Sequence, residues 1–150
     1  MDVITIDTPE LGDRSYLVSD GTFAVVFDPQ RDVDRLFEMI DGRKLSVTHV
    51  FETHLHNDYV SGGLELARSY GAEYVVAGGR LASYECCEAL EGMKFRSGAL
   101  VAEVVATPGH TQDHASYVVT GGDGTKGVFT GGSMLYGTGR GDCSIDRKSG

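Results

Sequence analysis

Apolar residues alternate with polar ones along many short stretches of the chain, a period of two that is typical of half-buried strands. This pattern, together with β-branched runs, predicts strands over residues 3–6, 15–19, 22–28, 44–53, 73–77, 93–95, 100–107, 116–120 and 127–130. The period changes to that of an amphipathic helix in two segments, which predicts helices over residues 33–40 and 64–70. Gly42 and Gly71 follow these segments and are expected to end the helices.

Two segments fit the pattern less well. Residues 81–90 carry no clean period, and a third helix is the prediction there. Residues 135–150 are rich in glycine, serine and charge, so they are predicted to be irregular. The 150 residues suit a single domain with a real core. Because strands come first and then interleave with helices, we expect an α/β layered domain with a mixed sheet.

Composition and charge narrow the possible classes of function. The chain has 22 acidic and 13 basic residues, and its net charge of −9 disfavours binding to nucleic acid. No apolar run approaches the roughly 18 residues of a membrane span. The acidic, alternating start lacks the basic and apolar blocks of a signal peptide. Three cysteines, two of them adjacent, form no disulfide framework. We therefore expect a cytoplasmic protein that binds neither nucleic acid nor membrane.

A loop with two histidines follows the strand predicted to end at Thr53. In an extended backbone, residues two apart point to the same side, so His54 and His56 can place two imidazoles in one pocket. Asp58, two residues further on, can add a carboxylate oxygen. Imidazole and carboxylate ligands suit zinc, iron or manganese. The alternative is a pair of solvent-exposed loop histidines without a metal.

A second histidine motif also begins where a predicted strand ends. Pro108 and Gly109 force a sharp turn that directs His110 out of the strand edge. A third imidazole beside the first two would make a three-histidine metal site with open positions, as a catalytic metal requires. His114 follows four residues later, and the sequence leaves open whether it supports the site or lies on the surface. His49, inside an apolar strand, is predicted to be a core residue.

These motifs resemble those of the metallo-β-lactamase superfamily. The family pattern is Thr-His-x-His-x-Asp-His, then Thr-Pro-Gly-His-Thr, then Phe-Thr-Gly-Asp, and the corresponding stretches here are residues 53–59, 107–111 and 129–132. The resemblance implies the αββα sandwich, with two mixed β-sheets flanked by helices and the metal at one sheet edge. Because family members continue further, it also implies a C-terminally shortened form of that fold.

Within the superfamily, the chain looks most like the persulfide dioxygenase branch, which is often fused to rhodanese domains and is similar to glyoxalase II. That branch uses iron and O₂ to oxidise the sulfur of a low-molecular-weight thiol persulfide. Relatives of the glyoxalase II type use two metals to hydrolyse a thioester. Two departures matter here, since Tyr59 replaces a histidine and Gly132 replaces an acidic ligand. Both departures favour a single metal ion.

The resemblance implies one transition metal, Fe(II) or Zn(II), held by His54, His56 and His110 with Asp58 nearby. Asp58 and Tyr59 are the expected catalytic residues, as a group that orients water and as a hydrogen-bond donor. The favoured function is persulfide oxidation on a small thiol compound. A zinc-dependent thioester hydrolase and an inactive metal-binding or partner-binding remnant are the alternatives. Because a shortened sandwich leaves an apolar sheet face uncovered, we also expect a homo-oligomer.

Overall fold

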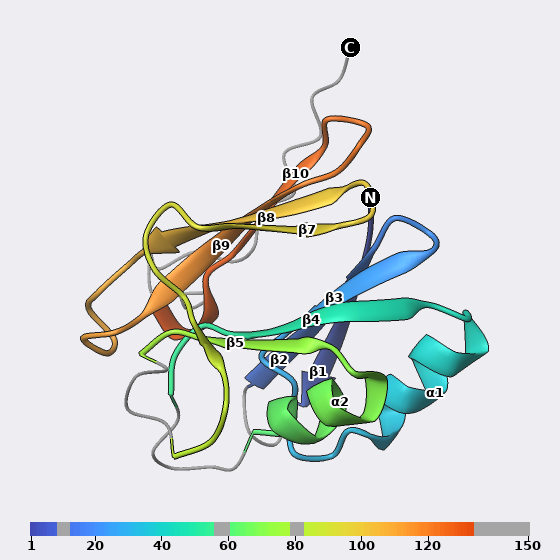
Figure 1. Ribbon diagram of the computed structural model, residues 1–150, viewed down its shortest axis with the longest axis horizontal. Helices are drawn as coiled ribbons and strands as arrows, with labels where there is room; N and C mark the ends of the chain where they lie inside the picture. Colours follow the sequence, from blue (N-terminus) through green and yellow to red (C-terminus); the bar gives the residue numbers. More distant parts are fainter. Residues whose placement is uncertain (9–12, 56–60, 79–82, 134–150) are drawn as a thin grey trace.

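Two β-sheets pack face to face in the computed structural model, which describes residues 1–8, 13–55, 61–78 and 83–133 (Figure 1). The first sheet has six strands in chain order: β1 (Asp2–Thr8), β2 (Asp13–Ser19), β3 (Phe23–Phe27), β4 (Ser46–Glu52), β5 (Glu73–Val76) and β6 (Cys87–Glu88). The first three strands are antiparallel, whereas β3, β4, β5 and β6 run parallel. This sheet is therefore mixed, as the sequence predicted.

The second sheet has four strands in the order β10-β9-β8-β7, with β7 (Lys94–Ser97), β8 (Leu100–Ala106), β9 (Ala115–Thr120) and β10 (Lys126–Phe129). Every pairing in it is antiparallel within the described part of the chain. The expectation of two mixed sheets is therefore wrong for the strands described. Short turns join β7 to β8 and β9 to β10, and the loop of residues 107–114 joins β8 to β9, whereas a parallel pair would need a long crossover connection.

Two helices cover the outer face of the first sheet. They are α1 (Asp34–Gly42) and α2 (Gly63–Tyr70), and both lie on the same side of that sheet in Figure 1. Gly71 caps α2 in the left-handed conformation, with φ 63°, as the glycine in the sequence predicted. No helix among the described residues covers the outer face of the second sheet, and none is long and apolar enough to cross a membrane.

The segment around residues 81–90 differs from its prediction. Where it is described, from residue 83 onward, it forms no helix, and Cys87–Glu88 instead make the short strand β6 beside β5. The burial of two neighbours explains this outcome. Cys87 packs against the core between the two sheets, whereas Cys86 packs against the core beneath the helices. Adjacent side chains on opposite faces have the period of a strand and not that of a helix.

An aromatic cluster fills the core between the sheets. Phe27 stacks between Phe51, at a centroid distance of 4.9 Å, and Phe129, at 4.3 Å, and Tyr117 packs beside them. These four side chains are fully buried, and each contributes about 1.5–3 kcal/mol by leaving water. Phe27 and Phe51 come from the first sheet, while Tyr117 and Phe129 come from the second. The cluster therefore fixes the two sheets against each other near the ends of β3, β4 and β10.

Candidate metal centre

The parallel strands β3 and β4 end at the same edge of the first sheet, and a buried hydrogen-bond network forms there. Asp28 follows β3, has a positive φ of 45°, and donates its N–H to the carbonyl of Phe51 at 2.9 Å. Its carboxylate accepts the N–H of Thr53 at 2.8 Å and the hydroxyl of Thr53 at 3.0 Å. The first residue after β4 is thus held by the first residue after β3.

This network fixes how the His54 imidazole is protonated. The Thr53 hydroxyl lies 2.9 Å from Nδ1 of His54 and has only one proton, which it gives to the Asp28 carboxylate. It therefore accepts a hydrogen bond from Nδ1–H of His54. This tautomer carries its lone pair on Nε2, the electron pair that a metal ligand needs. Buried to all but 7% of its surface, His54 is set in orientation before any metal arrives.

His110 reaches the same place from the second sheet. It lies in the turn between β8 and β9, where the N–H of Thr107 bonds to the carbonyl of His114 at 2.9 Å and closes the loop. The ring centroids of His54 and His110 are 4.9 Å apart, and the rings are nearly perpendicular at 88°. Two imidazoles predicted as metal ligands from separate motifs are thus brought together by the fold.

His114 joins these two rings as a third imidazole. It is buried to 98% of its surface, and its Nδ1 lies 2.8 Å from the hydroxyl of Thr107. Its ring stacks beside that of His54 at 5.2 Å and lies 6.2 Å from that of His110. The sequence left open whether His114 supports the site, and the structure places it there. The position of His114 in the sequence, at the end of the loop that begins at Thr107, was the feature that could have predicted this placement.

The third family motif, residues 129–132, lies against the other two motifs at Gly131 and Gly132. Gly131 has φ 48°, and a side chain at this position would overlap the hydroxyl of Thr53. A Cβ atom on Gly132 would lie 2.9 Å from Cδ2 and Nε2 of His110. The position that is acidic in the resembling families therefore lies directly beside His110, and here it offers no oxygen.

The remaining predicted site residues lie outside the described part of the chain. His56, Asp58 and Tyr59 belong to residues 56–60, so their roles stay predictions. Among the described residues, no three histidine, cysteine, aspartate or glutamate side chains are arranged to hold a metal ion. The predicted ligand His56 and its neighbour Asp58 belong to residues 56–60, so the complete ligand set stays a prediction. The donor chemistry fits that prediction, because His54 and His110 already supply two imidazoles from opposite sides.

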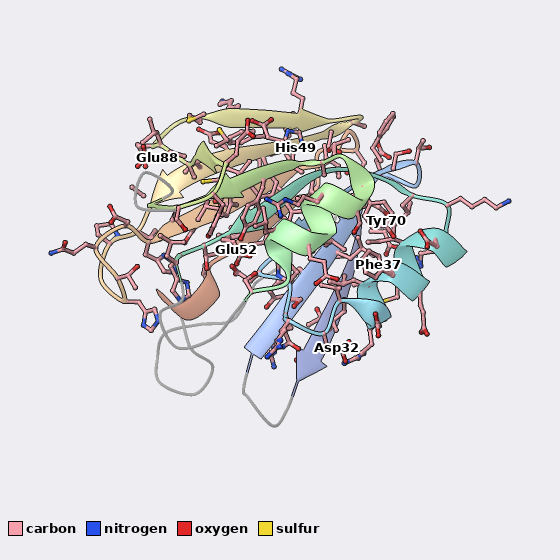
Figure 2. The ribbon with its side chains drawn as sticks, turned by 60° about the horizontal axis from the view of Figure 1, so that its bottom comes forward. Asp32, Phe37, His49, Glu52, Tyr70 and Glu88 are labelled. Carbon is pink, nitrogen blue, oxygen red and sulfur yellow. The ribbon has the colours of Figure 1, made fainter. Side chains whose placement is uncertain are left out.

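A buried glutamate, missed at the sequence level, supports the far end of the histidine loop. Glu52, labelled in Figure 2, accepts a hydrogen bond from Tyr74 at 3.0 Å and another from Ser61. Burial, and then the negative charge of Asp28, raise the pKa of Glu52 well above its usual value. A charged residue at the end of an apolar strand was the signal that could have revealed it.

The loop is held at its exit as well as at its start. Ser61 follows the loop, and its hydroxyl bonds to the Pro29 carbonyl at 3.1 Å. The N–H of Gly62 bonds to the same carbonyl at 3.2 Å. A side chain on Gly63 would overlap the carboxyl of Glu52, so glycine is required there. Both ends of the segment that carries His54 and His56 are therefore fixed to the first sheet.

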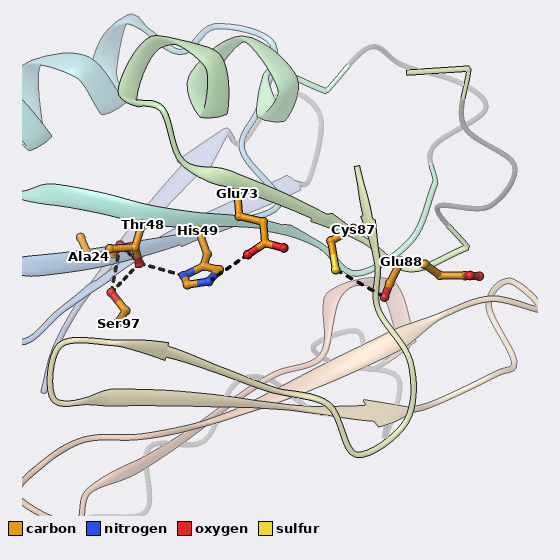
Figure 3. Close-up of polar contacts among 7 residues, drawn as sticks. All are labelled: Ala24, Thr48, His49, Glu73, Cys87, Glu88 and Ser97. Carbon is orange, nitrogen blue, oxygen red and sulfur yellow. Dashed lines mark hydrogen bonds and ion pairs between the residues drawn. The ribbon is translucent and has the colours of Figure 1, made fainter. Parts of the chain in front are cut away.

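A second polar cluster lies within β4 and apart from its end (Figure 3). His49 contacts the hydroxyl of Thr48 at 2.8 Å and the carboxylate of Glu73 at 3.5 Å. Burial lowers the pKa of His49, although the charge of Glu73 opposes this effect. Burial also raises the pKa of the neighbouring Cys87 thiol, which disfavours a thiolate nucleophile. His49 is half-buried and packs against two core rings, those of Phe51 and Phe95, as the sequence predicted.

An open groove of about 560 Å³ runs from His110 over the outer face of the second sheet. Its floor is formed by Val105, Val118 and Val128, and Pro108 stands at its rim. The lining contains no aspartate, glutamate, lysine or arginine from the described part of the chain, and apart from hydroxyl groups and the imidazole these lining residues are apolar. The half-buried valines match the apolar sheet face expected from the sequence, whereas self-association through it stays a prediction.

Comparison with known proteins identifies the family. A family model for the metallo-beta-lactamase superfamily matches residues 10–85, about half of the chain. Among similar proteins, the hydroxyacylglutathione hydrolase of Bradyrhizobium sp. (strain ORS 278) is 32% identical over 125 residues, which cover 80% of this chain and 47% of that protein. The atrochrysone carboxyl ACP thioesterase AacuM of Aspergillus aculeatus is 28% identical over 130 residues, or 83% of this chain and 40% of that one.

Solved structures give the same result. ETHE1 from Myxococcus xanthus superposes with a TM-score of 0.72 and 34% identity, over 79% of this chain and 54% of that one. A metallo-beta-lactamase from Staphylococcus aureus subsp. aureus COL gives a TM-score of 0.71 and 27% identity, over 80% and 38%. These likenesses confirm the predicted fold. The chain spans about half the length of the curated relatives it matches. It belongs to the metallo-beta-lactamase superfamily, as its three motifs predicted.

Proposed function

We propose that this chain forms the metal site of an enzyme that acts on small sulfur compounds, and that its reaction is the oxidation of a thiol persulfide. One observation carries the proposal, namely the approach of the His54 and His110 rings to 4.9 Å from two different sheets. Gly132, beside His110, offers no carboxylate to bridge two metals, which supports a single ion. The likeness to ETHE1 of Myxococcus xanthus supports the same branch of the superfamily.

The proposed ligands are His54, His110 and the predicted His56, with Asp58 nearby. When bound there, a transition metal would supply open coordination positions. Fe(II) would offer them to sulfur and O₂, and Zn²⁺ would offer them to water and a thioester carbonyl. The chain's own contribution is orientation. Asp28 and Thr53 hold the tautomer of His54, and His114 packs against the same ring. Such hydrogen-bonded support typically changes metal affinity by about 10–100-fold.

Thioester hydrolysis is the second candidate, and the names of two relatives favour it. The similar bacterial proteins are hydroxyacylglutathione hydrolases, and the similar fungal protein is an ACP thioesterase. In this reaction Asp58 would orient the attacking water, and Tyr59 would donate a hydrogen bond to the developing oxyanion. The apolar groove beside His110 would suit the acyl part of a thioester equally well.

One set of measurements separates the candidates. The chain is purified without oxygen, its metal content is determined by elemental analysis, and two activities are assayed. Persulfide oxidation predicts about one iron per chain and O₂ uptake with glutathione persulfide. Zinc together with hydrolysis of lactoylglutathione would favour the second candidate. A metal-loaded chain that catalyses neither reaction would overturn the enzymatic proposal and favour a binding protein.

Histidine variants test the site itself. Replacing His54 or His110 with alanine removes a ligand, so the bound metal should fall from about one per chain to a small fraction. His49→Ala is the matched control, because it removes a histidine of β4 that lies in the core. It should lower stability and retain the metal. Loss of metal from His49→Ala with retention in His54→Ala would show that the site is assigned to the wrong residues.

A further inference from the structure

A second hollow, distinct from the groove beside His110, opens at the Asp28 end of the first sheet. Its volume is about 450 Å³. Ile6 and Leu36, both buried, form an apolar floor, and Arg31 and Arg35 stand on the wall that leads into α1. Pockets of about 300–1,000 Å³ with an apolar lining and a few polar groups are typical of small-ligand sites.

The two arginines have donors to spare. Arg31 is exposed and makes no hydrogen bond or ion pair with any residue in the described part of the chain. Arg35 donates from Nη1 to the carbonyl of Asp7 at 3.2 Å, which uses one of its five N–H groups. A guanidinium binds a carboxylate through two parallel N–H groups, which makes arginine well suited to recognise this anion.

The local charge differs from that of the whole protein. Among the described residues that line it, two are cations, Arg31 and Arg35, and one is a carboxylate, Asp32, whereas the chain as a whole carries −9. The Asp32 carboxylate already accepts the N–H of Asp34 at 3.3 Å, at the start of α1. An anion that approaches this acidic protein is therefore attracted to this wall more than to its surroundings. The apolar floor strengthens that attraction because it lowers the local dielectric constant.

A chain of hydrogen bonds links the wall of the hollow to the segment that carries His54. Ser15 lines it, donates its hydroxyl to the Asp28 carbonyl at 2.7 Å, and accepts the N–H of Gln30 at 3.2 Å. The Asp28 carboxylate holds Thr53, which precedes His54. Ser15, Asp28 and Thr53 lie on three neighbouring strands, so about 10 Å, or two strand spacings, separates the wall of the hollow from the strand of His54. Figure 2 places Asp32 beside the end of β1 at this edge.

We propose that this hollow binds a carboxylate of the thiol compound on whose sulfur the metal centre acts, with Arg31 as the main anchor and Arg35 as the second. The inference rests on the proposed function for the identity of the ligand. A thiol carrier of tripeptide size spans about 10 Å between its sulfur and a terminal carboxylate, at up to about 3.5 Å per residue. This span matches the two strand spacings between Ser15 and Thr53.

The test measures binding without turnover. S-Methylglutathione, which cannot react, and its dimethyl ester, which lacks both carboxylates, are titrated calorimetrically into the metal-loaded chain. Arg31→Gln should weaken binding of the acid by about tenfold, equivalent to about 1.4 kcal/mol, and leave binding of the ester unchanged. Arg35→Gln should weaken binding of the acid by a smaller factor. Arg96→Gln is the control, because it removes an exposed arginine of the second sheet outside the hollow.

Three results would overturn the inference. They are the absence of binding of S-methylglutathione to the unsubstituted chain, equal binding of acid and ester, and an Arg31→Gln variant that matches the unsubstituted chain. Failure of the proposed function is recognised separately. In that case neither glutathione persulfide nor lactoylglutathione is turned over, whereas the titrations with the unreactive acid still report on Arg31.

Discussion

The two sides of the metal centre are built differently. On the first sheet, the segment that carries His54 is held at its start by Asp28 and at its exit by Ser61. On the second sheet, His110 is exposed, sits on a loop closed by backbone hydrogen bonds, and borders an open groove. The first proposed ligand, His54, is therefore fixed in orientation, whereas the second, His110, is exposed and less constrained. In the proposed site, one fixed ligand and one less constrained ligand would let the two imidazoles close on a metal without straining either sheet.

The largest expected effect comes from filling the space beside Thr53. Gly131→Ala places a methyl group against the Thr53 hydroxyl at a positive φ, so it should destabilise the fold by about 2–4 kcal/mol. Gly124→Ala is the matched control, since φ is 79° there and no atom lies within 4 Å. It should cost only about 1 kcal/mol. Urea denaturation measures both, and equal losses would mean that the first side is not tightly packed.

The next largest effect is expected on metal affinity, from removing the threonine hydroxyls that contact His54 and His114. Thr53→Val keeps the shape of the side chain but removes the acceptor for His54 Nδ1–H, and should weaken metal binding by about 10–100-fold. Thr107→Val removes the hydroxyl beside His114 and should weaken it by less than about threefold, because His114 is not a predicted ligand. Metal titrations against a competing chelator measure both variants. A larger loss in Thr107→Val would reverse the proposed roles of the two sides.

A carboxylate restored beside His110 should strengthen metal binding on the second sheet's side of the site. Gly132→Asp should tighten Fe(II) binding by about tenfold, because a carboxylate helps retain a hard divalent ion. The new Cβ would lie 2.9 Å from the His110 ring, which is exposed and able to shift. Gly132→Asn adds nearly the same volume without the charge and should leave the affinity unchanged. Equal Fe(II) affinities of all three chains, titrated without oxygen, would place Gly132 outside the coordination sphere.

The smallest effect is expected far from the metal centre. Asp20 accepts the N–H of Ala99 at 2.8 Å and that of Phe23 at 2.8 Å, and these bonds lower the pKa of its carboxyl. A lowered pKa in the folded state means that this stabilisation is present above the unfolded pKa, near 4, and is lost as the pH falls. Asp20→Asn should lower Tm by about 2–4 °C at pH 7 and by less at pH 3. A deficit that is unchanged at pH 3 would contradict the electrostatic account.

Sequence patterns predicted the strands and the two helices because alternation and helical periodicity are local properties. They also predicted that His54 and His110 would meet, since each motif follows a strand end. The supporting residues Asp28 and Glu52 were missed because their roles depend on which strands are neighbours, and local periodicity does not determine this. The same gap explains the wrong helix over residues 83–90, where Cys86 and Cys87 face different cores. The burial of His114 likewise depends on the packing of two sheets.

The bonds that join the sheets at the metal centre have one more consequence. The N–H of Ala115 donates to the Thr53 carbonyl at 2.8 Å, and the hydroxyl of Tyr117 donates to the Glu52 carbonyl at 2.9 Å. His54 follows the first sheet and His110 lies in a loop of the second. The two hydrogen bonds therefore set the relative position of the two rings. Any ligand that binds both rings is thermodynamically linked to that relative position, and at 100 times its Kd it would stabilise the native state by about 2.7 kcal/mol. Variants that weaken the contacts between the two sheets are then expected to bind metal with lower affinity.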